Sequence, residues 1–319
     1  METSSAYASP KIAYFLDQPI ISLVKQRIRA ILASDGPLQK VLDDLQETNG
    51  KMVRPILVAL SSELSGGCDE HALIDIATGI ELIHIASLVH DDIIDEAELR
   101  RNEPTIQSRY GQSVAVLTGD YLFSTAFLLF TNQKQPAILH GMTDAIREMC
   151  TGEVNQLVAP EQTEAFYWRY IYQKTACLLG AACKSGPLLA GDTSLEVTNQ
   201  LEQFGVNLGY AFQLIDDLLD YVGDTDVLGK SKGIDFRQGL YTLPIIRAMN
   251  RSLLPNDWVV SMTESQVTEI LKCNGLLDEL YQEACAFSQK AIDILDTFPP
   301  SDGQRHLVNL AQFIVERKS

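Results

Sequence analysis

Apolar residues recur at intervals of three and four along most of this chain, which is the spacing of an amphipathic helix. The pattern is clear over residues 20–31, 57–64 and 73–87, and the second of these runs stops at Gly66-Gly67, a pair typical of a helix end. Convincing alternation of apolar and polar residues, which would indicate strands, is absent from the sequence. We therefore predict an all-α chain. Further helices are expected over residues 112–130, 136–158, 162–190, 195–222, 240–250, 264–274, 276–296 and 303–317.

The breaks between these helices are short. They fall at Asn132 to Pro136, at Gly191-Asp192, at Pro255-Asn256 and at Pro299-Pro300, where the residue types favour turns. No long linker rich in proline, glycine or serine divides the sequence, and no change of composition marks a boundary. Although the length of 319 residues would allow two domains, we predict a single domain over residues 1–319.

The charge of the chain restricts its partners. Its hydrophobic content of 46% is ordinary for a globular protein, but its net charge is −17. Such acidity argues against nucleic acid or an anionic membrane as the main partner, because both bind to positive surfaces. A phosphate-bearing substrate would also be repelled, unless local basic groups or bridging metal ions hold it.

Cysteine usage and the N-terminal segment indicate a cytoplasmic protein. The six cysteines contain no CxxC pair, and we expect them to be free thiols in a reducing compartment. The first residues lack the basic stretch and apolar run of a signal peptide. No uninterrupted apolar run approaches the roughly 18 residues that a membrane span needs.

One short pattern, Asp-Asp-x-x-Asp, occurs twice in the sequence. The first copy contains Asp91 and Asp95, and the second contains Asp216 and Asp220. Residues four apart lie on one face of a helix, so each pair of carboxylates is stacked and repels. Both copies end strongly apolar helical runs, and we expect them at the mouth of a cavity where a cation relieves the repulsion. Oxygen ligands without His or Cys favour Mg²⁺ or Mn²⁺ over Zn²⁺, and Mg²⁺ commonly takes further ligands from substrate phosphates.

A solvated acidic surface would explain one such motif, since short motifs often occur by chance. Two copies, each followed by basic residues, favour a diphosphate site instead. Arg100-Arg101 follow the first copy, and Lys230 lies in a glycine-flanked loop after the second. Arginine and lysine bind phosphate directly, arginine often through two parallel hydrogen bonds. Further candidates are Lys51, Arg54, His84 and the Lys174-Thr175 pair.

Taken together, these motifs resemble those of the trans-type polyprenyl diphosphate synthases, and the similarity covers almost the whole chain from residue 50 onward. The most specific segments are ELIHIASLVHDDIIDEAELRRNEPT, GDYLF, GEVNQ, KTACLL, GYAFQLIDDLLDY and LGKSKGIDFRQGLYTLPI. The resemblance implies a bundle of long helices around a deep central cavity, the isoprenoid synthase fold, and usually a homodimer. It also implies a Mg²⁺-dependent prenyltransferase that adds isopentenyl diphosphate, head to tail, to an allylic diphosphate such as farnesyl or geranylgeranyl diphosphate.

The resemblance further implies roles for individual residues. Asp91 and Asp95, with Asp216 opposite, would bind Mg²⁺ on the allylic diphosphate. The family often reads GGKRxRP, whereas this chain has Asn49 in place of the first glycine and Met52 in place of a basic residue. The remaining expected site residues are Asp92, Asp217 and Asp220, which complete the motifs; Arg100, Lys174, Thr175, Gln213 and Lys230, which contact the allylic diphosphate; and Lys51, Arg54, His84 and Arg101, which contact isopentenyl diphosphate.

The implied reaction is an ionisation, a condensation and an elimination. The allylic diphosphate ionises, the double bond of isopentenyl diphosphate attacks the allylic cation, and a proton leaves with the departing diphosphate. Ala86 and Ser87 lie about one helical turn before Asp91, and their small side chains leave room for a growing chain. By resemblance, small residues here are typical of long-chain synthases, with products beyond geranylgeranyl diphosphate.

Other functions are compatible with part of this pattern. The chain could be the catalytic subunit of a heteromeric synthase that needs a small partner subunit, and the activity of the purified chain would decide this. A terpene cyclase uses the same ionisation, but those enzymes usually lack the second Asp-Asp-x-x-Asp and the Lys51 and Arg54 pair. A purely structural helical protein explains neither acidic motif.

Overall fold

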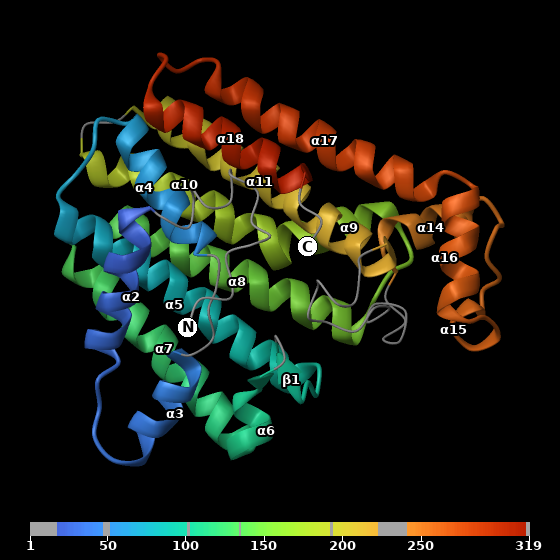
Figure 1. Ribbon diagram of the computed structural model, residues 1–319, viewed down its shortest axis with the longest axis horizontal. Coiled ribbons are helices and arrows are strands. Elements are labelled where there is room, and N and C mark those ends of the chain that lie inside the picture. The colour runs from blue at the N-terminus through green and yellow to red at the C-terminus, as the bar shows by residue number, and fades with distance from the viewer. Residues whose placement is uncertain are drawn as a thin grey trace, which may run out of the picture. The chain divides into compact units, whose positions relative to one another are not determined.

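The computed structural model describes residues 18–46, 52–100, 103–133, 135–191, 194–222 and 241–316 of the chain (Figure 1). Most of these residues are helical. Within these ranges the only strands are β1 (Leu99–Arg100) and β2 (Glu103–Pro104), which pair antiparallel, with Leu99 opposite Pro104. The prediction of an all-α chain is confirmed.

The chain forms two compact units. Unit 1 is drawn from Met1–Thr143, Ala181–Glu202 and Pro300–Asn309, and unit 2 from Asp144–Gly180, Gln203–Pro299 and Leu310–Ser319. The prediction of one domain over residues 1–319 stays a prediction.

The helices divide between these units as follows. Unit 1 contains α2 (Pro19–Ile31), α3 (Pro37–Gln46), α4 (Val53–Leu64), α5 (Glu70–Ile94), α6 (Ile106–Tyr110) and α7 (Gln112–Asn132). Unit 2 contains α9 (Glu164–Ile171), the π-helix η1 (Tyr172–Ala176), α14 (Leu243–Asn250), α15 (Trp258–Ser261), α16 (Glu264–Cys273) and α17 (Leu276–Leu295). Residues of both units occur in α8 (Pro136–Val158), α10 (Cys177–Ala190), α11 (Leu195–Val222) and α18 (Asp302–Glu316).

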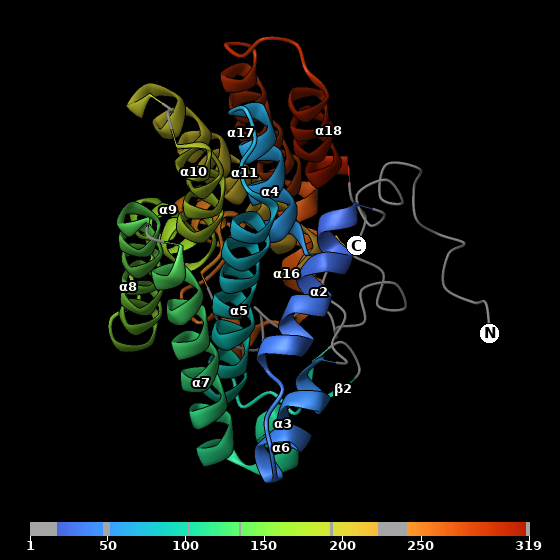
Figure 2. The ribbon, with the colours of Figure 1, turned by 90° about the vertical axis from the view of Figure 1, so that its left-hand side faces the viewer.

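Helix α5 is the centre of unit 1, with α7 on one side and α2 and α4 on the other (Figure 2). It begins at an N-cap, where the carboxylate of Asp69 accepts a hydrogen bond from the backbone N–H of Ala72 at 3.0 Å. Residues 76–83 are all buried. A helix that is buried on every side needs neighbours all round it, and the three flanking helices provide them.

Both α5 and α7 are long and apolar enough to cross a membrane, judged by length and composition alone. Core helices share these properties. The two helices pack against each other within unit 1, and α5 also buries the polar side chains of Glu81 and Asp92. We therefore interpret both as core helices.

Two apolar clusters form the interior of unit 2. One joins α9, α11, α14 and α17 around Tyr167, and the other surrounds the fully buried Trp258. Beside the first cluster, the guanidinium of Arg247 on α14 donates to Glu164 of α9 at 3.2 Å and to Glu283 of α17 at 2.9 Å. These ion pairs hold α9, α14 and α17 together at the edge of the cluster.

The predicted helices agree closely with the structure. Those expected over residues 136–158 and 195–222 have the observed ends. Helix α4 ends at Leu64 before Gly66 and Gly67, which both adopt positive φ and whose N–H groups bond back to the helix. The helix predicted over residues 162–190 is a continuous run of α9, η1 and α10. Its π-helical stretch was not predicted, because apolar spacing does not distinguish one wider turn from its neighbours.

In unit 1, α10 approaches α4 at backbone contact. A Cβ atom on Gly186 would lie 2.6 Å from the carbonyl carbon of Ser61. The neighbouring Ser61 and Ser62 are themselves buried, so the backbone of α4 has no free space to move into. Glycine is the residue that fits this crossing.

Substituting Gly186→Ala should therefore lower the free energy of unfolding by about 1–3 kcal/mol, the range for an overfilled core. Gly141→Ala is the matched control, because a Cβ on that helical glycine meets no atom within 4 Å. Alanine there should stabilise α8 by about 0.5–1 kcal/mol through its higher helix propensity. Urea unfolding followed by circular dichroism measures both changes. A Gly186→Ala variant as stable as the unmodified chain would contradict the close crossing.

Candidate active site

The first acidic motif lies at the C-terminal end of α5. The helix ends at Ile94, and the backbone N–H of Asp95 still donates to the carbonyl of Asp91 at 2.8 Å. Asp91 and Asp95 are therefore one turn apart, as the spacing predicted. The last turn of α5 contains no basic residue. Anions at this end oppose the helix dipole as well as one another, so the motif favours a cation that the helix itself does not provide.

Asp92, the middle residue of the motif, has a different environment. Its side chain is buried, and Oδ1 accepts a hydrogen bond from Nε of Arg100 at 2.7 Å. Arg100 lies on β1, after the chain leaves the helix through Glu96, which has a φ of 51°. Arg100 therefore follows the motif in sequence but lies outside its helix, because α5 ends at Ile94.

Side chains from the segment after α5 donate hydrogen bonds to backbone carbonyls at the end of this helix. The hydroxyl of Thr105 donates to the carbonyl of Ala97 at 2.7 Å, and Nε2 of Gln107 donates to the carbonyls of Asp92 at 2.6 Å and Ala97 at 3.0 Å. The last carbonyls of a helix have no partner within the helix. These bonds therefore hold the acidic end in place without occupying its carboxylates.

His90, the residue before the motif, anchors α5 to α7. Its Nε2 lies 3.2 Å from the carbonyl oxygen of Val116, and its ring centroid lies 5.8 Å from that of Phe123. A Cβ atom on Gly119 would overlap the imidazole ring. Gly119 and Phe123 of the GDYLF segment therefore both contact His90. These contacts fix the rotation of α5 beside Asp91.

Ala86, predicted to influence product length, lies on the face of α5 that packs against α7. It shares this face with His90 and with Gly79, where a Cβ atom would overlap the ring of Phe130. Ala86 is fully buried, whereas Ser87 is half-buried and donates its hydroxyl to the carbonyl of His84 at 2.8 Å. A larger side chain at position 86 would therefore press toward α7.

The second acidic motif lies near the C-terminal end of α11, whose last turn also lacks a basic residue. Asp216 and Asp220 are half-buried and one turn apart, while Asp217 between them is only 6% exposed. The phenol of Tyr167 donates to Oδ2 of Asp217 at 2.6 Å, and Nε2 of Gln213 donates to Oδ1 at 2.9 Å. The middle aspartate of this motif, like Asp92 in the first, is therefore held inward by hydrogen bonds.

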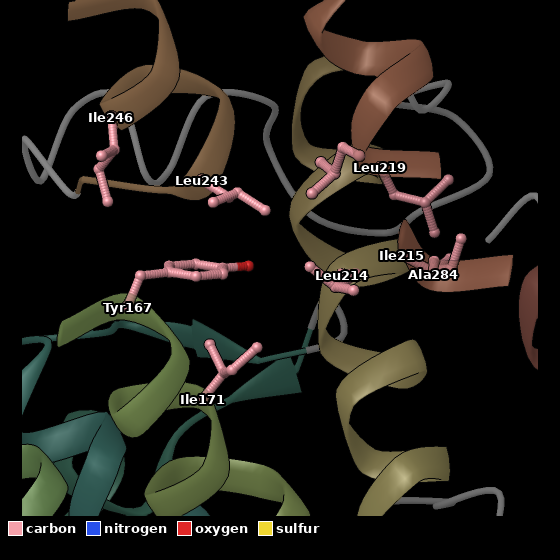
Figure 3. Packing of buried hydrophobic residues seen from close by; sticks show 9 residues of the cluster. Tyr167, Ile171, Leu214, Ile215, Leu219, Leu243, Ile246 and Ala284 are labelled. Atoms are coloured by element: carbon pink, nitrogen blue, oxygen red, sulfur yellow. The ribbon is translucent and has the colours of Figure 1, made fainter. Parts of the chain in front are cut away.

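Tyr167 reaches Asp217 through an apolar environment. Figure 3 shows its ring between Ile171 on one side and Leu243 and Ile246 on the other, with the hydroxyl directed toward α11. Burial raises the pKa of Asp217 to about 7, and the charges of Asp216 and Asp220 add to this, although the two hydrogen bonds act in the opposite direction. A bound cation would favour the charged form.

The π-helix η1 brings Thr175 to the second motif. In this turn the N–H of Cys177 donates to the carbonyl of Tyr172, five residues earlier. The hydroxyl of Thr175 donates to Oε1 of Gln213 at 2.7 Å. A Cβ atom on Gly209 of α11 would overlap Ala176, so η1 and α11 are in direct backbone contact. Wider π-turns are common at functional sites.

Lys174 lies beside Thr175 on the same turn. Its Nζ donates to the hydroxyl of Tyr170 at 2.9 Å and lies 3.7 Å from a carboxylate oxygen of Glu153. Gly152, the residue before Glu153 in the GEVNQ segment, lies against η1, because a Cβ atom on it would be 2.7 Å from Cβ of Gln173. Helix α8 thus packs on η1 and supplies a counter-charge for Lys174.

The structure connects part of the predicted set. Within unit 1 it joins Asp92 to Arg100, and within unit 2 it joins Thr175, Gln213 and Asp217. The predicted meeting of the two motifs around one cavity stays a prediction, as do the roles of Arg54, half-buried on α4, and His84, half-buried on α5. Three predicted residues, Lys51, Arg101 and Lys230, lie outside the described residues.

The carboxylates fit a metal that the substrate helps to bind. In the part of the chain that the structure describes, no group of three or more His, Cys, Asp or Glu residues could hold a metal ion. Each motif instead presents two carboxylates one turn apart and turns the third inward. Mg²⁺ is usually bound by one or two carboxylates together with water and substrate phosphates. In unit 1 the residues that would hold such an ion are Asp91 and Asp95, and in unit 2 the residue is Asp216.

Sequence reasoning missed several residues that support these motifs. Thr105 and Glu153 belong to segments that carried the resemblance, but their contacts gave no signal in the sequence. Gln107 follows Thr105 by two residues without any recognisable pattern. Tyr167 lies in an aromatic stretch, FYWRY, that is equally compatible with ordinary core packing.

Comparisons with known proteins agree with the geometry. The family model for polyprenyl synthetase matches residues 35–274. The chain is 36% identical to the octaprenyl diphosphate synthase of Haemophilus influenzae, with 95% of each chain covered. It is 33% identical to heptaprenyl diphosphate synthase component 2 of Geobacillus stearothermophilus, with 95% of this chain and 97% of that one covered.

A solved structure gives the same result for the fold. The polyprenyl synthase of Caulobacter crescentus CB15, complexed with calcium and isoprenyl diphosphate, matches with a TM-score of 0.89 and 31% identity. The match covers 99% of this chain and 100% of that one. The resemblance that the motifs indicated is confirmed, and the chain belongs to the polyprenyl synthetase family.

Proposed function

We propose that this prenyltransferase condenses isopentenyl diphosphate with an allylic diphosphate, head to tail, to make a trans-polyprenyl diphosphate longer than geranylgeranyl diphosphate. One observation carries the proposal. In each acidic motif the middle aspartate is buried and held by donors, while the aspartates before and after it lie one turn apart. Repelling carboxylates at the negative end of a helix reduce stability, so a binding function explains them better than a structural one.

The basic and polar side chains of the chain would bind and orient the allylic diphosphate. Nε of Arg100 stays on Asp92, which leaves the terminal nitrogens of the guanidinium to bind phosphate oxygens. Lys174 adds a second positive charge where negative charge develops on the leaving group. Mg²⁺ held by the aspartates would supply Lewis acid stabilisation of that same charge.

The remaining steps need no nucleophile from the protein. Thr175 and Gln213 orient the reacting end of the substrate, and the apolar surroundings exclude water from the allylic cation. The double bond of isopentenyl diphosphate, bound through Arg54 and His84, attacks this cation. The proton that is then lost goes to the departing diphosphate.

Two observations support a long product. Ala86 is small and buried on the face of α5 toward α7, so it offers little obstruction to a growing chain. The relatives from Haemophilus influenzae and Geobacillus stearothermophilus are named as octaprenyl and heptaprenyl synthases. Farnesyl or geranylgeranyl diphosphate would be the starting substrate.

We further propose a cytoplasmic homodimer. On α7, the side chains of Val116, Leu117 and Leu128 are between 43% and 68% exposed, and apolar surface of this kind is typical of an interface. All six cysteines are free thiols, which fits a reducing compartment. The name "component 2" of the Geobacillus relative favours a second candidate, a catalytic subunit that requires a small partner.

The purified chain tests the proposal directly. With Mg²⁺, isopentenyl diphosphate and farnesyl diphosphate, it should form a polyprenyl diphosphate of more than four isoprene units, identified by chromatography after dephosphorylation. Sedimentation of the active sample should show a homodimer. No product from the folded, pure chain would favour the heteromeric alternative, and release of a cyclic hydrocarbon would favour a terpene cyclase.

Substituting Asp91→Ala or Asp216→Ala should lower turnover by at least about 100-fold, because metal positioning supplies several kcal/mol of the barrier reduction. Asp293→Ala, which changes an exposed aspartate on α17, is the control and should retain activity. Initial rates with radiolabelled isopentenyl diphosphate measure the effect, and circular dichroism checks the fold. Near-normal turnover in either motif variant would refute the assignment.

Replacing Ala86→Phe should shorten the product. The larger ring fills the space beside α7 about one turn before Asp91, where the growing chain is expected to pass. Product length is read by chromatography, and the urea midpoint shows whether the variant is still folded. A folded variant with an unchanged product would show that this face of α5 does not meet the chain.

A further inference from the structure

Three hydrogen bonds form a continuous chain through unit 2. The phenol of Tyr167 on α9 donates to Oδ2 of Asp217 at 2.6 Å, and Nε2 of Gln213 donates to Oδ1 of the same carboxylate at 2.9 Å. The hydroxyl of Thr175 on η1 donates to Oε1 of Gln213 at 2.7 Å. The reaction described above uses Thr175 and Gln213 but gives Tyr167 no role.

In its ionised form, Asp217 fixes the direction of every bond in this chain. A carboxylate accepts hydrogen bonds and donates none, so Gln213 must turn its NH₂ group toward it. The carbonyl oxygen of Gln213 then faces Thr175, and it too can only accept. Thr175 must therefore donate its one hydroxyl proton to Gln213, and the lone pairs of its oxygen remain for a ligand.

Tyr167 holds the second oxygen of this carboxylate. Its phenol donates to Oδ2 of Asp217 while Gln213 donates to Oδ1, so both oxygens are fixed in position. The tyrosine is 4% exposed and its ring is packed among Ile171, Leu243 and Ile246 (Figure 3). The phenol therefore has no water to turn to, and the bond to Asp217 is its way of satisfying a buried hydroxyl.

We propose that Tyr167 is a positioning residue of the second acidic motif. By holding Asp217 inward, it sets the rotation at which Asp216 and Asp220 are presented. Tyr167 touches no reacting atom. The inference rests on the proposed function, because it assigns Tyr167 to the metal-dependent binding of the allylic diphosphate.

The first motif has the same arrangement with a different donor. In unit 1 the buried Asp92 is held by Arg100 at 2.7 Å, just as Asp217 is held by Tyr167 in unit 2. The two contacts come from unrelated segments of the chain, so one local fold does not explain both. A buried middle aspartate with its own donor is therefore a common feature of both motifs.

Tyr167→Phe removes the hydroxyl and keeps the ring. Residues that orient metal ligands typically contribute 10–100-fold to metal affinity or activity. We therefore expect kcat to fall at least about 10-fold, while KM for isopentenyl diphosphate stays within about two-fold because its binding residues are untouched. In calorimetry with farnesyl thiodiphosphate, an unreactive allylic analogue, the Mg²⁺ concentration for half-maximal binding should rise about 10-fold.

Tyr110→Phe is the matched control. The phenol of Tyr110 on α6 donates to Oδ2 of Asp44 at the same 2.6 Å, and neither residue has a part in the proposed reaction. This control should also lose stability, though less because Tyr110 is only half-buried, and it should keep the Mg²⁺ dependence of analogue binding. If Tyr167→Phe lowers the urea midpoint as the control does but leaves the Mg²⁺ dependence unchanged, the phenol is merely structural and the inference is wrong.

A second variant tests the same carboxylate without changing the apolar packing around Tyr167. Asp217→Asn keeps the side-chain size but adds a donor, so Gln213 is no longer forced into one orientation. It should shift the Mg²⁺ dependence at least as far as Tyr167→Phe, and the double variant should shift it little further, since both act through one group. Fully additive shifts would contradict the inference.

The same experiments separate this inference from the proposed function. If the unmodified chain makes no polyprenyl diphosphate and binds no analogue, the proposed function fails. If it does both, and Tyr167→Phe behaves like the unmodified chain in kcat and in Mg²⁺ dependence, the inference about Tyr167 alone is overturned.

Discussion

Carboxylates at the C-terminal end of a helix repel one another and also oppose the helix dipole. Both acidic motifs of this chain contain that conflict, and neither helix offers a basic residue in its last turn. In each motif the structure relieves this conflict for one of the three aspartates. The middle aspartate is buried against a donor, which is Arg100 for Asp92 and Tyr167 for Asp217. The outer two carboxylates of each motif are thereby presented as a pair, which is the donor set that a substrate-bridged divalent cation needs.

Much of the surrounding sequence serves this presentation. His90 packs on α7 at Gly119, Gln107 holds the carbonyl of Asp92, and Gly209 lets α11 meet η1. Several segments that carried the family resemblance therefore act through packing and backbone hydrogen bonds. A motif can be specific to a family without any of its residues touching the substrate, because small errors in ligand placement reduce catalysis strongly.

The fold could be predicted because long helices with one apolar face leave a strong periodic signal. The short helices α3, α6 and α15 and the β1–β2 hairpin were missed, since a periodic pattern needs several repeats to stand out, and these elements span from one to fewer than three periods. Within the site, the aspartates were predicted from their spacing. Tyr167 was not, because its partner Asp217 lies 50 residues away and its aromatic neighbours are equally typical of core packing.

The two middle aspartates are held by donors of different charge, which matters in a chain as acidic as this one. The guanidinium of Arg100 brings a positive charge to Asp92, whereas the phenol of Tyr167 is neutral and holds Asp217 by a hydrogen bond alone, and burial raises the pKa of Asp217 to about 7. With a net charge of −17, the chain as a whole repels phosphate. The carboxylates concentrated at two helix ends favour cations there, and bound cations would offset the repulsion of a diphosphate.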